Sequence, residues 1–599
     1  MKKCKKVLAI VLTALIAVST QAVTMPVTAA TVKAESVGSE IKSGDFYYYV
    51  LEDGTAEISN YVGSSNAVIP SKIDKYVVSS IGYMAFSRDR IVSVEIPDTI
   101  NHIDEYAFYQ CTQLKEVSIP NSVKTICSFA FSGCTALEKV KLSNSITKIE
   151  NDTFRNCNAL THISIPYGVT DIEYDAFAYC ENLSIIGFPS TLTFVEENSF
   201  RETAWYNNKG NGLVYAGNVL YEFKGETTEP IVLSSNTVSI SPYAFRNATY
   251  IEEVIVPNGI TKINYQSFAQ CETLKSVSLP ETLKEIEYYA FYECHNLENI
   301  NLPDSIETID IGAFSNCESL TEINIPSNLT QIPDALFNNC SSLKEVKFHN
   351  NITSIGSQAF YNCALTDIVL PKNLRSIHPN AFYKCYYLEN ITFPNSLKLI
   401  GYDAFTATTW YDSQPEGFIY AGPVLYKYKG YNTNSITNVK IKEGTLALSE
   451  SAFNGLYYLS SVELPDGFTT INDYVFTSKN YLTKIYMPAS VNDISYNAFL
   501  YMGLSGVTIY GYSNTYAQEY AKEFNMNFIA IDTLKAGDVN GDGTVNIKDV
   551  TDIQKDCAGL DSIFSAKNPA ADVNSDKTVN INDVTEIQKH IAGMSTCIK

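Results

Sequence analysis

Two segments near the C-terminus carry oxygen-bearing side chains at the spacing of a calcium-binding loop. Positions 1, 3, 5, 7, 9 and 12 of the first segment are Asp538, Asn540, Asp542, Thr544, Asn546 and Asp549. The same positions of the second segment, further along the chain, are Asp572, Asn574, Asp576, Thr578, Asn580 and Asp583. Carboxylate, amide and hydroxyl oxygens at this spacing wrap a hard cation such as Ca²⁺. A solvated acidic turn would not produce twelve matched positions, so the sequence predicts two bound calcium ions.

The two loops differ at position 6, where the backbone of a calcium loop turns sharply. Gly543 occupies this position in the first loop and adopts a positive φ at little steric cost. Lys577 occupies it in the second loop, where its Cβ makes the left-handed conformation costly. Position 12 is Asp in both loops, whereas an EF-hand has Glu there. Both loops carry aspartate at positions 1, 5 and 12, so their carboxylate ligands are equal in number. We therefore expect the conformational cost at Lys577 to make the second loop bind calcium more weakly.

Each loop is predicted to lead into a helix, at residues 550–558 and 584–592, and both halves contain the string V-N-I-x-D-V-T-x-I-Q-K. This duplicated half EF-hand resembles the type I dockerin over about residues 537–594. The resemblance implies calcium-dependent docking onto a cohesin module of a scaffoldin, as in cellulosome-type assemblies. It also implies that positions 10 and 11 of each loop, with the helix that follows, contact the cohesin. Those residues are Ile547, Lys548, Gln554, Lys555, Ile581, Asn582, Gln588 and Lys589.

The chain before these loops is organised around a repeated 23-residue unit. Residues 297–319 read LENINLPDSIETIDIGAFSNCES, and related copies recur from about residue 81 to about residue 503. The phenylalanine of the Ala-Phe pair marks most copies: Phe86, Phe108, Phe131, Phe154, Phe177, Phe200, Phe245, Phe268, Phe291, Phe314, Phe337, Phe360, Phe382, Phe405, Phe453, Phe476 and Phe499. A fixed period of this size is typical of a stacked repeat. One copy has too few apolar residues to fold alone, so neighbouring copies must share a continuous core.

Within one copy, residues 299–302 alternate polar and apolar side chains, which predicts a short strand that Pro303 ends. Residues 306–317 are expected to return as turns or short helical pieces. The pattern L-x-x-I-x-[IL]-P-x-x-[IV]-x-x-I-x-x-x-A-F-x-x-C resembles the BspA-like leucine-rich repeats. The resemblance implies an extracellular setting and a repeat solenoid of about eighteen 23-residue coils. We expect short parallel strands plus turns or short helices, β-hairpin caps, and then the small all-α calcium-binding dockerin.

The ends of the chain carry segments of other composition. Four lysines at positions 2, 3, 5 and 6 precede an apolar run at 7–18 that is too short to span a bilayer, which predicts a secretory signal peptide. A β-hairpin is expected at residues 46–58, and a strand, a helix capped by Asn514 and a second strand at 507–531. The predicted organisation is a signal peptide at 1–30, a linker at 31–44, an N-terminal β cap at 45–80, the solenoid at 81–503, a C-terminal cap at 504–531, a linker at 532–537 and the dockerin at 538–594.

Two longer gaps in the repeat, near residues 205–235 and 410–440, each predict a hairpin insert. The inserts contain the two tryptophans of the chain, Trp205 and Trp410. One interpretation is a pair of exposed aromatic platforms. The other, which we favour, is that each tryptophan packs against the adjoining coil.

Most of the 14 cysteines fall in one column of the repeat, three residues after the phenylalanine. The column contains Cys111, Cys134, Cys157, Cys180, Cys271, Cys294, Cys317, Cys340, Cys363 and Cys385. Stacked neighbours could come within disulfide reach, but side chains in one column point the same way. We therefore expect buried, unpaired thiols that fill a turn. Cys127, Cys557 and Cys597 lie outside the column.

No arrangement typical of catalysis is found, so no catalytic residue is predicted. The six histidines form no H-E-x-x-H, and neither a G-x-S-x-G nor a phosphate loop is present. The net charge of −22 disfavours nucleic acid and anionic membrane as partners. The sequence predicts a secreted, extracellular binding or adhesion protein with no membrane span, whose solenoid contacts a protein, cell-surface or plant-wall ligand. The alternative is a subunit that degrades plant-wall polysaccharides, because most dockerin proteins are such enzymes.

Overall fold

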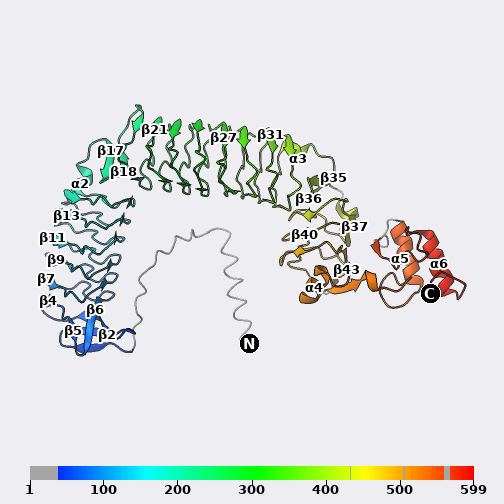
Figure 1. The fold of residues 1–599 in the computed structure, drawn as a ribbon, viewed down its shortest axis with the longest axis horizontal. Coiled ribbons are helices and arrows are strands. Elements are labelled where there is room, and N and C mark those ends of the chain that lie inside the picture. Colours follow the sequence, from blue (N-terminus) through cyan, green and yellow to red (C-terminus); the bar gives the residue numbers. More distant parts are fainter. Residues whose placement is uncertain (1–37, 432, 503–505, 559–566, 599) are drawn as a thin grey trace. The chain divides into compact units, whose positions relative to one another are not determined.

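The computed structural model describes residues 38–431, 433–502, 506–558 and 567–598 (Figure 1). The predicted signal peptide at 1–30 and the first half of the predicted linker, residues 31–37, lie outside these ranges. The chain divides into two compact units, one formed by the residues up to 189 together with 198–207, and the other by 190–197 together with 208–599. Among the helices in the described ranges, none combines the length and the apolar character that crossing a membrane requires.

The first unit begins with the predicted hairpin. β2 (Phe46–Val50) pairs antiparallel with β3 (Ala56–Tyr61), and β1 (Ile41–Ser43) adds a further antiparallel strand within the segment expected to be a linker. β3 then pairs in parallel with β6 (Tyr76–Ile81), which also pairs with the short β5 (Lys72–Ile73). Because β6 continues into the repeat sheet, the hairpin covers the open edge of the first coil, as expected of a cap.

Each coil of the first unit contributes two short strands, and both rows of strands are parallel. The first row is β4 (Asn66–Val68), β7 (Ser93–Glu95), β9 (Glu116–Ser118), β11 (Lys139–Lys141), β13 (His162–Ser164) and β15 (Ile185–Gly187). The second row is β6, β8 (His102–Ile103), β10 (Thr125–Ile126), β12 (Lys148–Ile149) and β14 (Asp171–Ile172). The unit ends with the short helix α2 (Ala204–Asn207).

The second unit repeats this plan. Its first row is β19 (Ile231–Val232), β21 (Glu253–Ile255), β23 (Ser276–Ser278), β25 (Asn299–Ile300), β27 (Glu322–Asn324), β29 (Glu345–Lys347), β31 (Asp367–Val369), β33 (Asn390–Thr392), β37 (Asn438–Lys440), β39 (Ser461–Glu463) and β41 (Lys484–Tyr486). Its second row is β16 (Phe194–Val195), β20 (Ser239–Ile240), β22 (Lys262–Ile263), β24 (Glu285–Ile286), β26 (Thr308–Ile309), β28 (Gln331–Ile332), β30 (Ser354–Ile355), β32 (Ser376–Ile377), β34 (Leu399–Ile400), β38 (Ala447–Leu448), β40 (Thr470–Ile471) and β42 (Asp493–Ile494).

The second row of strands was not predicted, because the return segment was expected to contain only turns or short helical pieces. In β26, for example, Ile309 is buried while Thr308 is exposed. A strand of two residues leaves no alternation of apolar and polar side chains to detect in the sequence. The remaining residues of the return segment form turns, as expected.

The repeated phenylalanines form the centre of the core in each unit. The rings of Phe108 and Phe131 stack with centroids 5.0 Å apart in the first unit, and those of Phe291 and Phe314 stack 5.2 Å apart in the second. All four side chains are fully buried. Since each ring stacks on its equivalent one coil away, the column joins successive coils through dispersion contacts.

The column cysteines are buried, which confirms the predicted packing role. Each Sγ donates to the carbonyl of the phenylalanine one coil earlier, as from Cys134 to Phe108 (3.2 Å) and from Cys317 to Phe291 (3.2 Å). Burial raises the pKa of the Cys385 thiol to about 12, so this thiol stays protonated at neutral pH.

Both inserts form the predicted antiparallel hairpins, β17 (Gly212–Ala216) with β18 (Val219–Lys224) and β35 (Gly417–Ala421) with β36 (Val424–Lys429). The tryptophans lie just before them, on α2 and on α3 (Thr409–Asp412). The Trp205 ring centroid is 4.8 Å from that of Phe200, and the Trp410 centroid is 5.3 Å from that of Phe393. The platform interpretation is therefore wrong, and both tryptophans pack against the adjoining coil.

The second unit continues through β43 (Thr508–Gly511), α4 (Tyr516–Glu523) and β44 (Asn527–Ala530), in the predicted order of strand, helix and strand. The predicted cap is wrong by one residue, because Thr515 is the N-cap and Asn514 has a left-handed φ of 56°. In the described ranges, short 3₁₀ turns lie at Thr433–Ser435 and Ile531–Thr533, and the helices α5 (Ile547–Cys557) and α6 (Ile581–Ile591) follow.

Candidate metal centre

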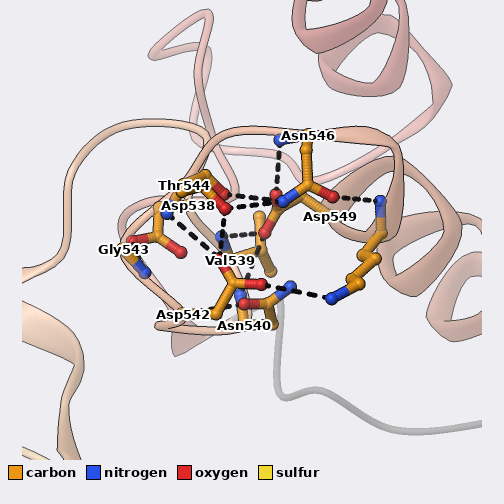
Figure 2. A network of polar contacts seen from close by, with 9 residues as sticks. Asp538, Val539, Asn540, Asp542, Gly543, Thr544, Asn546 and Asp549 are labelled. Carbon is orange, nitrogen blue, oxygen red and sulfur yellow. Dashed lines mark hydrogen bonds and ion pairs between the residues drawn. The ribbon is translucent and has the colours of Figure 1, made fainter.

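The first acidic loop is closed by the carboxylate at its twelfth position. Asp549 accepts hydrogen bonds from the backbone N–H groups of Val539 (2.8 Å) and Asn540 (3.2 Å) through Oδ1, and from Asn546 (2.8 Å) through Oδ2. Figure 2 shows these contacts together with those of the other loop residues. The Asp549 side chain is fully buried, so the two ends of the loop are held to one carboxylate.

Asp538, at the first position, supplies an acceptor that no group of the described chain satisfies. Its Oδ2 accepts from the backbone N–H of Gly543 (3.0 Å), while its Oδ1 is buried without a hydrogen-bond partner. Burial, with the charges of Asp549 and Asp542, raises the pKa of the Asp538 carboxyl. A buried oxygen of this kind loses its hydration without compensation unless a cation replaces the water. The loop therefore fits a calcium ion.

The second loop repeats this arrangement. Asp583 is fully buried and accepts from the backbone N–H groups of Asn574 (3.3 Å) and Asn580 (2.9 Å). Asp572 accepts from the backbone of Asp576 (3.0 Å) and Lys577 (2.9 Å). The twelve predicted ligands thus lie in two loops whose last carboxylates accept similar backbone hydrogen bonds, but Oδ1 of Asp572 has a backbone donor where Oδ1 of Asp538 has none.

The backbones of the two loops share two left-handed positions but not the residues that occupy them. At position 6, Gly543 has φ of 86° and Lys577 has φ of 70°. At position 4, Gly541 has φ of 73° and Ser575 has φ of 62°. The two loops also differ in sequence at position 4, which is glycine in the first loop and serine in the second. Only position 6, however, was predicted to be strained. The second loop therefore has two strained positions where the first has none.

Both helices begin three residues earlier than predicted. Asn546 caps α5 by accepting from the backbone N–H of Lys548 (2.9 Å), and Asn580 caps α6 in the same way from Asn582 (2.8 Å). Each asparagine forms a capping box with the aspartate three residues later. Because the ligand side chains also act as caps, the helix starts inside the loop, and positions 10 and 11 lie on its first turn.

The core of this region is made by equivalent residues of the two halves. The buried pairs, which occupy matching positions in the two halves, are Val539 with Val573, Val550 with Val584, and Ile553 with Ile587. Ile598, near the end of the chain, joins this core and was not predicted. The two loops and helices therefore form one small folding unit.

The eight residues proposed to contact a cohesin lie on or beside the first turns of the two helices and along their length. Ile547 and Ile581 are 60% and 61% exposed, which is unusual for large apolar side chains. Lys548, Gln554, Lys555, Asn582 and Gln588 are also exposed. Lys589 is half-buried and pairs with Glu586 at 2.7 Å. The structure thus leaves two equivalent apolar points, one from each half, on the surface.

The solenoid has a polar groove beside the first row of strands in the first unit. The groove has a volume of about 630 Å³, and its charged lining residues are Glu95, Asp98 and Lys141. Ser118 and Asn121 contribute further polar groups.

Comparison with known proteins identifies families for both parts of the chain. A family described as BspA type leucine rich repeat region matches residues 79–205, 220–344, 312–413 and 425–527. A family described as dockerin type I domain matches residues 536–592. None of the curated proteins compared with the chain matches it.

Solved structures similar to this chain include bacterial leucine-rich repeat proteins. A leucine rich cell surface protein from Faecalibacterium prausnitzii is 26% identical, with 59% of this chain and 95% of that protein covered and a TM-score of 0.30. A leucine-rich repeat protein from Bacteroides ovatus is 24% identical, with 82% and 99% covered and a TM-score of 0.24. One from Eubacterium ventriosum is 22% identical, with 62% and 96% covered and a TM-score of 0.31.

Proposed function

The chain belongs to the BspA type leucine-rich repeat family and carries a type I dockerin domain, and from this we propose that it is a secreted, non-catalytic binding protein of an extracellular complex. Its dockerin would dock onto a cohesin module of a cellulosome-type scaffoldin. Its solenoid would then present a binding face to a protein, a cell surface or plant-wall material.

The observation that carries this proposal is the pair of equivalent loops with inward carboxylates. Type I dockerin domains bind calcium, and we propose two ions here, one in each loop. In the first loop the unsatisfied Oδ1 of Asp538 would become a ligand, beside Asp542 and Asp549. The ion would supply the positive charge that offsets these carboxylates. Because Asp549 is also bonded to the backbone at both ends of the loop, the residues that hold the ion also fix the start of α5.

The exposed isoleucines would form the centre of the cohesin contact. Ile547 and Ile581 stand at the starts of α5 and α6, and neighbouring Lys548 and Asn582 supply polar groups around them. An apolar side chain surrounded by polar ones is typical of the centre of a protein–protein contact. The calcium loops would therefore act by positioning these first turns rather than by contacting the partner.

The polar groove of the first unit favours a polar ligand for the solenoid. Glu95 and Asp98 line the groove together with Lys141, which lies on a strand two coils further along, so the groove carries both signs of charge. This arrangement suits a ligand with hydroxyl or mixed charged groups, such as a protein surface or a polysaccharide. We propose no catalytic residue in it.

The proposal is tested by calorimetric titration of the full chain with a panel of cohesin modules, in calcium and in EDTA. We expect one or more cohesins to bind in calcium and none in EDTA. Replacing Asp538 and Asp572 together by alanine should abolish binding, whereas the matched control Asp98→Ala should leave it unchanged. Binding that survives EDTA would overturn the calcium dependence. A parallel screen on polysaccharides distinguishes the two function classes, since any hydrolysis would overturn the non-catalytic proposal.

A further inference from the structure

Three side chains on two adjacent coils of the first unit place a nitrogen, an oxygen and a sulfur atom together. They are His102, Asp104 and Cys127, and their ligand atoms all lie within 4.8 Å of one another. The His102 Nε2 is 3.8 Å from Cys127 Sγ and 3.8 Å from Asp104 Oδ1. All three side chains are half-buried, so they are accessible from solvent yet partly enclosed.

The register of the second row of strands brings these residues together. His102 and Asp104 flank the buried Ile103, so their side chains leave the backbone on the same side. Ile126 pairs with Ile103 in parallel, and Cys127 therefore follows its strand at the level where Asp104 follows the previous one. The residues that pair with His102 in the row are Ser80 and Thr125.

The backbone around the cluster is held by coil-to-coil hydrogen bonds. The N–H of Asp104 donates to the carbonyl of Ile81 (2.9 Å), and that of Cys127 donates to Ile103 (2.9 Å). Asp104 Oδ1 also accepts from the backbone N–H of Glu105 (2.8 Å), which orients the carboxylate. The three ligand atoms are therefore carried by a rigid part of the fold, which lowers the cost of binding an ion.

From this geometry we propose that His102, Asp104 and Cys127 bind a divalent transition-metal ion of the Zn²⁺ type. Imidazole, carboxylate and thiolate are the usual ligands of zinc, whereas calcium takes oxygen ligands alone. In a tetrahedral zinc site, ligand atoms are roughly 3.3–3.6 Å apart, given zinc bonds of about 2.0–2.3 Å. The two separations from His102 Nε2, both 3.8 Å, exceed this by a few tenths of an ångström, and all three atoms lie within 4.8 Å of one another. Three protein ligands leave the fourth position to water.

The same residue types could instead suggest a cysteine nucleophile with a histidine base, but the geometry opposes it. In such a triad the two nitrogens of the imidazole have different partners. Here the thiol and the carboxylate both lie nearest to Nε2. Convergence of both groups on one nitrogen favours an ion between the three atoms over a proton relay.

The sequence supports a specific role for Cys127. The positions equivalent to it in the next two coils are Glu150 and Glu173, so packing at this level does not require a cysteine. It also differs from the buried column thiols, since it is half-buried and follows the second-row strand. The site lies in a different unit from the calcium loops and would not depend on them.

The test uses the reduced full chain with calcium in excess, so that the dockerin loops are filled, and Co²⁺ as the probe. Cobalt bound to a thiolate gives a charge-transfer band in the near-ultraviolet, which oxygen ligands do not give. We expect the band to saturate at one Co²⁺ per chain and to disappear when Zn²⁺ displaces the cobalt. In the same calcium-containing buffer, equilibrium dialysis with Zn²⁺ in place of Co²⁺ should give one tightly bound zinc ion per chain.

Two variants remove ligands and two serve as matched controls. Cys127→Ser and His102→Gln should each lose the band and lower zinc affinity at least tenfold. Cys597→Ser and His162→Gln, which change exposed residues elsewhere, should keep the cobalt band and the zinc affinity of the parent chain. Absence of the band in the parent chain, or its persistence in Cys127→Ser, would overturn the proposal. Circular dichroism of each variant establishes that it is folded, and because the replaced side chains are half-buried we expect folded spectra.

Discussion

Lys577 and Ser575 show at the scale of single residues how two loops with the same ligands come to differ. Both have left-handed backbones, at φ of 70° and 62°, where the first loop has glycines. The left-handed conformation costs a non-glycine residue roughly 1–2 kcal/mol. The expectation from the sequence concerned position 6 alone, and the structure adds position 4.

We predict that residues 538–549 fill first in a calcium titration and residues 572–583 second. Lys577→Gly should raise the affinity of the second loop about tenfold, since about 1.4 kcal/mol corresponds to a factor of ten. Ser575→Gly should act in the same direction. Calorimetry resolves the two steps, and Lys577→Ala is the control because it removes the charge but keeps the Cβ. An unchanged affinity in Lys577→Gly would contradict the strain argument.

A second prediction at this scale concerns the thiols. The column cysteines should react slowly with alkylating reagents in the native protein, because their thiols are buried. For Cys385, with a pKa of about 12, only about one thiol in ten thousand is ionised at pH 8. Cys557 and Cys597 are exposed and should react first. Mass spectrometry of peptides labelled before and after denaturation measures this, and disulfides between column cysteines of adjacent coils would contradict it.

At the scale of secondary-structure elements, the sequence predicted the repeat and its first-row strands but missed the short strands of the second row. The 23-residue period and the first-row strands, such as β9 and β23, follow from apolar residues in alternation with polar ones. The two-residue strands of the second row have one buried side chain each and carry no such signal. In the dockerin, Asn546 and Asn580 were predicted only as calcium ligands, and their capping of the helices, which moves each helix start into the loop, was not foreseen.

The short helix α3, which precedes the second hairpin insert, gives a prediction about stability. Trp410→Ala should destabilise the second unit by about 2–3 kcal/mol, below the range for a fully buried aromatic residue because Trp410 is half-buried. The lost contacts are those with the rings of Phe393 and Phe405. Thermal unfolding followed by fluorescence and circular dichroism measures the effect. The control is Tyr431→Ala nearby, where the side chain is 95% exposed and its removal should change little. Equal losses of stability in Trp410→Ala and Tyr431→Ala would contradict the packing role of Trp410.

At the scale of the whole molecule, the chain combines a hydrogen-bonded repeat with a small region built around two acidic loops. The phenylalanine column and the coil-to-coil hydrogen bonds need no metal, whereas the dockerin core has few apolar residues and depends on its loops. The sequence located both parts, because a period and a ligand spacing are local patterns. It could not provide the ligand of the solenoid, which depends on side chains from separate coils.

We therefore predict that calcium stabilises only part of the molecule. Adding calcium to metal-free protein should raise the unfolding temperature of the dockerin and leave that of the leucine-rich repeats nearly unchanged. Differential scanning calorimetry should show two transitions, of which the smaller one moves. The double variant Asp538→Ala with Asp572→Ala should lose this response. A single transition that shifts as a whole with calcium would contradict the separate unfolding of the dockerin and the leucine-rich repeats.

The register of the strands has a consequence for how such genes can change. Equivalent residues of adjacent coils pair directly, as Glu253 does with Ser276 and Ser276 with Asn299. Unequal recombination that adds or removes one whole copy therefore keeps every remaining pair in register. Each such event changes the length of the stack by roughly 4.8 Å, the spacing of neighbouring strands. The length of the repeat stack can thus change in fixed steps, without any new fold having to evolve.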